Sequence, residues 1–248
     1  MSEAILSVQG VSKRFGGVQA LQDVSFDLAP GDVMALAGDN GAGKSTLIKI
    51  ISGVYQADSG SMTYRNSGYQ PLNPRHSRDL GIETIYQDLA LADNLDVGAN
   101  IFLGREPVRQ WLGMFPVIDR QHMRNDSQEV LKNLDIDIPE SSLDQPVRRL
   151  SGGQRQAVAI SRAIYWNAEV LIMDEPTAAL GVPEQRKVMD LIGNLKARKI
   201  AIIFISHNLN DIFAVTDRIL VLRRGQKVGE CRTAEVEREE IVRMMVQG

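Results

Sequence analysis

Short apolar runs separated by amphipathic segments give the first picture of this chain. Three runs are almost wholly apolar: residues 33–37, 170–173 and 200–205. Runs of this kind predict strands buried on both faces, as in a parallel sheet covered by helices. Apolar residues at helical spacing predict helices at residues 46–52, 126–134, 153–164, 183–196 and 237–246. The alternation of the two patterns predicts an α/β fold.

Two further patterns refine this fold. Residues 5–9 and 24–28 alternate like short strands, which predicts antiparallel β elements near the N-terminus. Residues 218–222 and 226–230 predict a hairpin around an Arg-Gly turn. Between about residues 88 and 165 the pattern is that of amphipathic helices with polar loops. We therefore expect one domain, with a catalytic core at 1–87 and 166–248 and an inserted helical subdomain at 88–165.

Composition sets limits on function. The 248 residues carry 28 Lys and Arg against 31 Asp and Glu, a net charge of −3, which argues against nucleic acid as the main partner. The single cysteine, Cys231, excludes an internal disulfide or a multi-cysteine zinc site. No apolar run approaches the roughly 20 residues that cross a bilayer. One cysteine and no N-terminal signal segment lead us to expect a cytoplasmic protein.

The segment after the first buried strand fits the phosphate-binding pattern G-x-x-x-x-G-K-[ST], the P-loop, at every fixed position. It reads Gly38, Asp39, Asn40, Gly41, Ala42, Gly43, Lys44 and Ser45, with Thr46 next in the predicted helix. Glycines let backbone N–H groups point at phosphates, and the helix start adds a favourable dipole. Lys44 is predicted to bridge the β- and γ-phosphates of ATP, and Ser45 to ligate Mg²⁺. A plain Gly-rich turn is the alternative, which the complete match disfavours.

Two adjacent carboxylates follow the second buried strand. Asp174 ends this strand and is predicted to help hold Mg²⁺, while Glu175 is placed to act as a general base on the attacking water. Such a pair can also be a solvated strand end. The P-loop elsewhere in the chain favours the catalytic interpretation.

A second glycine sequence lies just before the helix predicted at 153–164. It reads Leu150, Ser151, Gly152, Gly153 and Gln154. Ser151 is a good helix N-cap, and the glycines expose backbone N–H groups, so the segment predicts a second anion site. In isolation it would indicate no more than a capped helix. Placed about twenty residues before the strand of Asp174, it resembles the L-S-G-G-Q signature of ABC transporter ATP-binding subunits, and the resemblance covers essentially the whole chain.

The resemblance implies roles for three more residues and a fold. Gln87 matches the glutamine that senses Mg²⁺ and water and faces the membrane subunit. His207 matches the switch histidine that contacts the γ-phosphate, and Phe15 matches the aromatic residue that stacks on adenine. By themselves, a lone His or Phe is more often structural. The implied fold is a P-loop NTPase with a RecA-like parallel sheet.

Within the family, the chain resembles bacterial importers of monosaccharides of the fructose or ribose type. The similarity rests on residues 38–43, 81–87, 101–106 and 178–181. Gly181 stands where many members carry an aspartate that reaches the partner's P-loop, so the resemblance does not extend to that contact. Most of this group fuse two ATPase halves, whereas this chain has one set of motifs.

The resemblance also implies partners. Two copies are expected to meet head to tail, so that each ATP lies between one copy's P-loop and the other copy's signature. Transmembrane permease subunits, and indirectly a periplasmic or extracellular binding protein, complete the importer, with this chain peripheral on the inner face of the membrane. The surface around residues 87–106 is expected to receive the permease. The apolar segment 111–115 either joins that surface or packs on the helical subdomain, and we favour packing.

Other functions stay open at this point. An ABC ATPase of DNA repair or translation would usually carry coiled coils, zinc cysteines or paired ATPase halves, which the sequence does not show. A GTP-dependent switch would carry an N-K-x-D sequence, which is absent. A subunit that binds ATP without hydrolysis is disfavoured by Glu175 and His207. An importer of a non-sugar solute is the remaining alternative.

Overall fold

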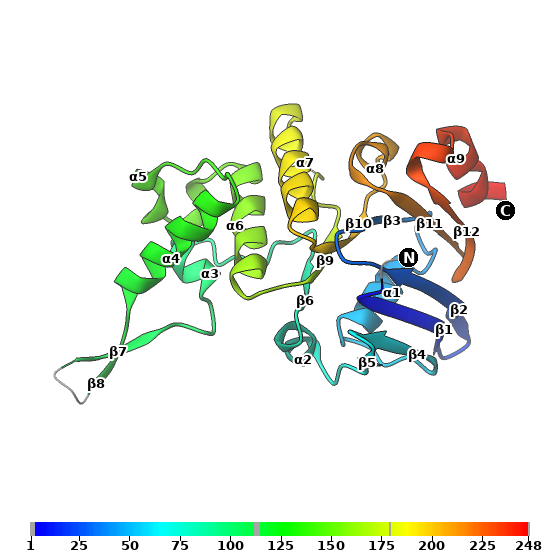
Figure 1. The fold of residues 1–248 in the computed structure, drawn as a ribbon, viewed down its shortest axis with the longest axis horizontal. Helices are drawn as coiled ribbons and strands as arrows, with labels where there is room; N and C mark the ends of the chain where they lie inside the picture. The colour runs from blue at the N-terminus through cyan, green and yellow to red at the C-terminus, as the bar shows by residue number, and fades with distance from the viewer. Residues whose placement is uncertain (1–2, 112–114, 179, 248) are drawn as a thin grey trace. The chain divides into compact units, whose positions relative to one another are not determined.

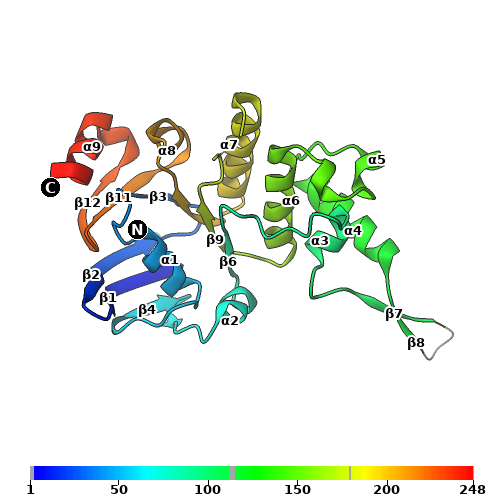
Figure 2. The ribbon, with the colours of Figure 1, turned by 180° about the vertical axis from the view of Figure 1, so that it is seen from behind.

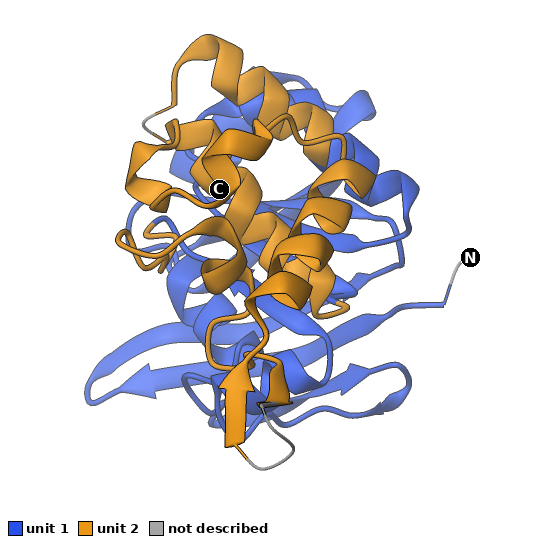
Figure 3. Cartoon of the chain, turned by 90° about the vertical axis from the view of Figure 1, so that its left-hand side faces the viewer, with its two compact units in different colours: residues 1–87, 168–177, 192–248 blue, residues 88–167, 178–191 orange. Residues whose placement is uncertain are grey.

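A computed structural model describes residues 3–111, 115–178 and 180–247. The chain forms two compact units, shown in separate colours in Figure 3. The first comprises residues 1–87, 168–177 and 192–248, and the second comprises residues 88–167 and 178–191. Each unit is described by itself below.

The first unit contains a six-stranded sheet in the order β12-β11-β3-β10-β9-β6. Its strands are β3 (Val33–Ala37), β6 (Ile82–Ile85), β9 (Val170–Asp174), β10 (Ala201–Ile205), β11 (Arg218–Arg223) and β12 (Gln226–Arg232). All neighbours are parallel except β11 and β12, which form the predicted hairpin. The predicted α/β class with a parallel core sheet is thereby confirmed.

A second, antiparallel sheet of the same unit has the order β2-β1-β4-β5. Its strands are β1 (Leu6–Phe15), β2 (Val18–Leu28), β4 (Ser59–Tyr64) and β5 (Ser67–Gly68). The first two strands are longer than the predicted 5–9 and 24–28. Register shifts along the β1–β2 pair, for example between Val8 and Val11, break the alternation of apolar residues that sequence patterns detect.

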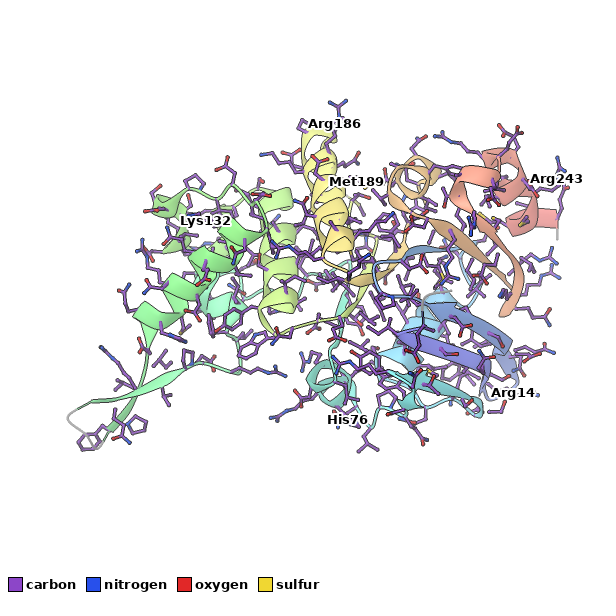
Figure 4. All side chains as sticks on the ribbon, viewed as in Figure 1. Arg14, His76, Lys132, Arg186, Met189 and Arg243 are labelled. Carbon is purple, nitrogen blue, oxygen red and sulfur yellow. The ribbon has the colours of Figure 1, made fainter. Side chains whose placement is uncertain are left out.

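The core of the first unit lies around α1 (Lys44–Ile51), as Figures 1 and 2 show. The apolar residues predicted for this helix, Leu47, Ile48, Ile50 and Ile51, are all buried. They belong to one cluster with buried residues of both sheets. Figure 4 shows side chains crowded between the strands and α1 of the first unit. Because these four buried residues fix α1 in the core, the loop that precedes it is held in place.

The remaining helices of the first unit are short. They are α2 (Pro74–Asp79), α8 (Leu209–Val215), η2 (Thr233–Glu235) and α9 (Arg238–Gln247). The long helix α7 (Val182–Ala197) begins among the residues of the second unit and ends among those of the first.

The second unit is mainly helical. Its elements are α3 (Val97–Ile101), β7 (Val108–Trp111), β8 (Phe115–Ile118), α4 (Arg120–Asn133), α5 (Glu140–Leu143), η1 (Val147–Arg149) and α6 (Gly152–Tyr165). The rings of Phe102 and Tyr165 pack with centroids 4.6 Å apart, and Trp166 packs edge-on against both. Among the described residues, no helix has the length and apolar character needed to cross a membrane.

The hairpin β7–β8 departs from the helices and polar loops predicted for this region. Its apolar side chains are largely exposed: Val108 by 65% and Phe115 by 55%. The predicted packing of segment 111–115 therefore does not hold for Phe115. Residues 112–114 lie outside the described residues.

Candidate functional site

The predicted P-loop lies between β3 and α1, where the whole of β3 is buried. Gly43 precedes the helix with φ 107°, in the left-handed region that favours glycine. A β-carbon there would stand 2.8 Å from the carbonyl oxygen of Ala20, and one at Gly38 would stand 2.3 Å from that of Leu222. These two glycines are thus required by the close approach of β2 and β11 to the loop.

Lys44 points back into its own loop. Its Nζ donates hydrogen bonds to the carbonyl oxygens of Gly38, at 2.5 Å, and Asp39, at 3.1 Å. Burial lowers the pKa of this amine, while the negative charges of Glu175, Asp174 and Asp39 oppose the shift. The loop therefore holds a cation at its centre, as binding of a triphosphate requires. Ser45 and Asn40 are exposed at the surface of the same loop and helix.

Asp174 lies at the carboxyl end of β9, paired in register with Ile205 at the end of β10. The carboxyl ends of parallel strands meet at one edge of a sheet, so Asp174 shares its edge with the P-loop. Burial, and then the charge of Glu175, raise the pKa of Asp174, whereas Lys44 and Lys49 act in the opposite direction. The Asp174 carboxylate is thus partly shielded from water and lies near a second negative charge, that of Glu175.

Glu175 and His207 meet at this edge. Nδ1 of His207 lies 2.8 Å from Oε2 of Glu175. That oxygen is buried and accepts no hydrogen bond within the described part of the chain. Glu175 has φ 53°, a left-handed conformation that is uncommon for this residue type, and its N–H donates to the carbonyl oxygen of Ile205 at 2.9 Å. The backbone thus turns the Glu175 carboxylate toward His207.

Gln87 also follows a strand of this sheet. It lies two residues beyond β6, whose last residue, Ile85, pairs with Met173 of β9. Its side chain is exposed. Five residues predicted from the sequence therefore lie at or beyond the carboxyl ends of strands, at one edge of the first unit's sheet. They are Lys44, Gln87, Asp174, Glu175 and His207.

Phe15 ends β1 in the antiparallel sheet and is 42% exposed. Tyr55 packs edge-on against it with ring centroids 5.1 Å apart, and the amine of Lys13 lies 5.6 Å from the Phe15 centroid. Lys49 of α1 lies 5.5 Å from the centroid of Tyr55. Tyr55 was not singled out from the sequence, because an aromatic residue shortly after a helix has no distinctive pattern.

The second glycine sequence begins α6 in the second unit. The hydroxyl of Ser151 accepts a hydrogen bond from the N–H of Gln154 at 3.2 Å, and Oε1 of Gln154 accepts one from the N–H of Ser151 at 3.0 Å. This reciprocal pair is a capping box. A β-carbon at Gly152 would stand 2.7 Å from Leu180, and one at Gly153 would stand 3.0 Å from Glu184. Packing thus favours glycine at both positions.

Gly181 lies beside the same helix start. A β-carbon there would stand 2.7 Å from Oε2 of Glu184, so a side chain at this position requires Glu184 to move aside. The carboxylate of Glu184 therefore lies beside Gly181, the position where many ABC ATPases carry an aspartate. Ala179, in the same predicted motif, lies outside the described residues.

Ser45 and Asp174 offer oxygen donors, the kind that Mg²⁺ prefers. Burial, and then the charge of Glu175, raise the pKa of Asp174, so a nearby cation would favour the charged form of this carboxylate. The residues present therefore fit Mg²⁺.

Comparison with known proteins agrees with this geometry. A family model described as ABC transporter matches residues 21–178. A solved ATP-binding cassette of an ABC transporter superposes with a TM-score of 0.84 at 26% identity, and the match covers 99% of this chain and 100% of that one. The fold is therefore that of an ABC ATPase cassette.

Three curated relatives show how far the similarity extends. The xylose/arabinose import ATP-binding protein of Sulfolobus acidocaldarius is 45% identical over 241 residues, 97% of this chain and 93% of the relative. The fructose import ATP-binding protein of Rhizobium meliloti is 43% identical over 91% of this chain and 87% of its own. The ribose import ATP-binding protein of Caldanaerobacter subterraneus is 42% identical over 98% of this chain but 48% of its own, so this chain spans about half of that relative. On these matches, together with the P-loop, the carboxylate edge and the capped signature helix, the chain belongs to the ABC transporter family.

Proposed function

We propose that this chain is the ATP-binding and ATP-hydrolysing subunit of an ABC importer for a monosaccharide. The proposal of ATP hydrolysis rests on the contact between His207 and Glu175. Nδ1 of His207 lies 2.8 Å from Oε2 of Glu175, at the sheet edge that also holds the P-loop. The monosaccharide is supported by the relatives that match along nearly their whole length, which import xylose, arabinose or fructose.

The P-loop is proposed to bind the phosphates of ATP. Backbone N–H groups of residues 38–46 face the phosphates, and Lys44 exchanges its two loop carbonyls for the β- and γ-phosphate oxygens. Ser45, Asp174 and Gln87 are the proposed residues around Mg²⁺, which when bound supplies positive charge to the phosphates. Phe15, held edge-on by Tyr55, offers its exposed face to adenine.

Glu175 is proposed as the general base toward the attacking water, and His207 as the contact to the γ-phosphate. Oε2 of Glu175 is buried and lies against Nδ1 of His207, while 17% of the side chain stays exposed, so the other carboxylate oxygen, Oε1, is proposed to take the proton from water. Because His207 contacts Oε2 of Glu175, its imidazole is proposed to link the general base to the γ-phosphate.

The signature is proposed to act on the ATP of a second copy. Residues 151–154 begin α6, and after the capping box is formed the N–H groups of Gly152 and Gly153 and the hydroxyl proton of Ser151 remain as donors. A head-to-tail pair places these donors on the partner's γ-phosphate.

We also propose the division of the chain that is expected from the sequence. Residues 1–87 and 166–248 form the catalytic core, and residues 88–165 form the subdomain that carries the signature.

Closure of the pair on ATP and its opening after hydrolysis are proposed to drive transmembrane permease subunits, with the surface around residues 87–106 as their contact. A periplasmic or extracellular binding protein delivers the sugar to the permease. The chain then works at the inner face of the membrane without entering it.

The test is reconstitution with the permease and binding protein in lipid vesicles. Xylose, arabinose, ribose, fructose and a panel of amino acids are each added while ATP hydrolysis and solute uptake are measured. We expect at least one monosaccharide to stimulate both, and no amino acid to do so. Stimulation by an amino acid alone would contradict the sugar assignment, and no hydrolysis with any solute would contradict the enzymatic one.

A further inference from the structure

Two loops at the carboxyl edge of the main sheet carry the proposed catalytic pair. The glutamate loop (residues 175–177) follows β9, and the histidine loop (residues 206–208) follows β10 and leads into α8, whose first turn contains Asp211. Beyond the contact between Glu175 and His207, the two loops are joined a second time, deeper in the first unit. The Thr177 hydroxyl donates a hydrogen bond of 2.6 Å to Oδ2 of Asp211.

This second junction is buried. Thr177 is 3% exposed and Asp211 is 7% exposed. The other carboxylate oxygen of Asp211, Oδ1, accepts a hydrogen bond of 3.1 Å from the side chain of Asn208. Within the described residues no ion pair reaches Asp211, so hydrogen bonds from the two loops hold its carboxylate. Loss of either donor would leave a buried carboxylate oxygen without a hydrogen bond, which costs free energy of folding.

His207 depends on such an anchor. Its side chain is 80% exposed, so packing does little to fix the imidazole. The residue that follows it, Asn208, is held by its bond to Asp211 and by the hydrogen bond of its N–H to Oγ of Ser206 at 3.0 Å. The left-handed backbone of Glu175 likewise persists only where its surroundings enforce it.

A local explanation covers only part of this network. Asn208 is the N-cap of α8, and Asp211 lies in the first turn of that helix, so their mutual bond helps to start the helix. The bond from Thr177 comes from 34 residues away, on a different loop, and no helix cap requires it. Its effect is to fix one loop relative to the other.

We propose that Thr177 and Asp211 are positioning residues for ATP hydrolysis: their buried hydrogen bond fixes the distance between Glu175 and His207. The proposal rests on the roles proposed above for those two residues. Thr177 and Asp211 act through the loops and touch neither nucleotide nor water in the reaction.

The first test compares three threonine variants of the full chain in Mg²⁺-dependent ATP hydrolysis. Thr177→Val removes the hydroxyl at nearly equal volume, and Thr177→Ser keeps it. Thr216→Val is the matched control, because Thr216 is also buried in the first unit and donates to the carbonyl oxygen of Ile212 at 2.9 Å. We expect Thr177→Val to lower kcat about tenfold to a hundredfold with KM nearly unchanged, since a misplacement of about 1 Å can cost about 10²-fold.

Rescue and thermal stability complete this comparison. Thr177→Ser is expected to restore kcat to within about twofold, because the positioning depends on the hydroxyl. Thr216→Val is expected to keep kcat while lowering the melting temperature as much as Thr177→Val does. Equal kcat values for Thr177→Val and Thr216→Val would overturn the proposal.

The second test asks whether Thr177 acts through His207. In a His207→Ala background, Thr177→Val is expected to have little further effect on the hydrolysis rate, because nothing is left to position. An undiminished further loss in that background would assign Thr177 a structural role instead. Asp211→Leu, which removes both acceptor oxygens at a similar volume, is expected to reproduce the pattern of Thr177→Val.

The third test needs no enzymatic activity. The imidazole signals of His207 in an NMR spectrum are identified by their loss in His207→Ala, and the chain contains two other histidines as internal references. We expect Thr177→Val to move the His207 signals and Thr216→Val to leave them in place. Unmoved signals in Thr177→Val would overturn the proposal. If Glu175→Gln and His207→Ala both leave hydrolysis intact, the roles proposed for Glu175 and His207 fail, and the coupling between the two loops is still decided by the spectra.

Discussion

Glycine stands at the start of both α1 and α6, as the N-cap Gly43 in one and as the first residue Gly152 in the other, yet the two first turns are held in opposite ways. α1 follows Gly43 in the left-handed region, and no side chain caps it. α6 follows Ser151, which forms a complete capping box with Gln154. The start of α1 thus leaves its N–H groups for a ligand, whereas the start of α6 satisfies part of its own donors before any partner arrives. The two roles proposed for these helix starts, phosphate binding within one chain and completion of a partner's site, are thus matched by two different constructions.

The strongest test of this comparison blocks the start of α6. Ser151→Arg is expected to abolish ATP hydrolysis, because a long cationic side chain fills the place of a partner's phosphate. ATP binding to the single chain is expected to stay normal in calorimetry, since the uncapped start of α1 is untouched. Ser141→Arg, at an exposed position of α5, serves as the control and should keep full activity.

A mixed pair sharpens the result. Combining Lys44→Ala chains with Ser151→Arg chains leaves one intact composite site, so activity is expected to return in the mixture. Loss of ATP binding in the Ser151→Arg chain alone would mean that both glycine sequences act on one nucleotide within one chain.

The next largest effect is expected on the α1 side. Glu175→Gln should slow turnover by about 10²–10⁴-fold, which is the usual contribution of a general base. ATP binding should persist because the P-loop is unchanged. The measurement is a single-turnover hydrolysis assay beside a binding titration, and near-normal turnover would remove Glu175 from its proposed role.

The capping box of α6 predicts a loss of stability. Ser151→Ala removes a capped hydrogen bond worth about 0.5–2 kcal/mol. For a chain of this size, each kcal/mol shifts the melting temperature by about 2–4 °C. Scanning calorimetry of the nucleotide-free protein measures the shift, and Ser141→Ala should leave the melting temperature nearly unchanged. An unchanged value for Ser151→Ala would mean that α6 needs no cap.

At the sheet edge beside α1, a substitution is expected to raise the melting temperature, whereas Ser151→Ala is expected to lower it. Burial and Glu175 raise the pKa of Asp174, so folding retains a proton that the unfolded chain has released, and stability falls as pH rises between the two pKa values. At neutral pH, Asp174→Asn should therefore raise the melting temperature of the nucleotide-free protein. Hydrolysis should fall at the same time. Asp190→Asn, on an exposed position of α7, is the control; a lower melting temperature for Asp174→Asn would refute the argument.

The smallest effect is expected at Tyr55. Edge-to-face aromatic pairs contribute about 0.5–1.5 kcal/mol, so Tyr55→Leu should raise the KM for ATP about 2–10-fold if Phe15 needs its support. Tyr55→Phe keeps the ring and should keep KM. Steady-state kinetics at saturating Mg²⁺ measures the effect, and an unchanged KM in Tyr55→Leu would show that Phe15 holds its place without Tyr55.

Much of the sheet was predictable because its signals are local. The five residues of β3 are apolar and fully buried, and the segment that follows them carries a motif with fixed spacing. The hairpin of β11 and β12 was likewise visible from its apolar strands and Arg-Gly turn. The same local reasoning placed helices α4, α6, α7 and α9 to within a few residues, except at the start of α4.

What the sequence did not reveal depends on contacts between distant residues. The hairpin β7–β8 exposes most of its apolar residues, so its strands lack the one-sided burial that produces an alternating pattern. The bond between Thr177 and Asp211 joins residues 34 positions apart, and neither residue stands out in its own segment. The approach of Glu184 to Gly153 similarly arises only when α7 packs beside α6.

Lys44 is bonded to the carbonyl oxygens of Gly38 and Asp39, both in the loop that precedes it. Its amine therefore closes the loop on itself, like a clasp between the two ends of one short segment. If Lys44 binds phosphate as proposed, binding exchanges one set of oxygen partners for another around a single nitrogen. The curvature of the loop then needs no ligand to form.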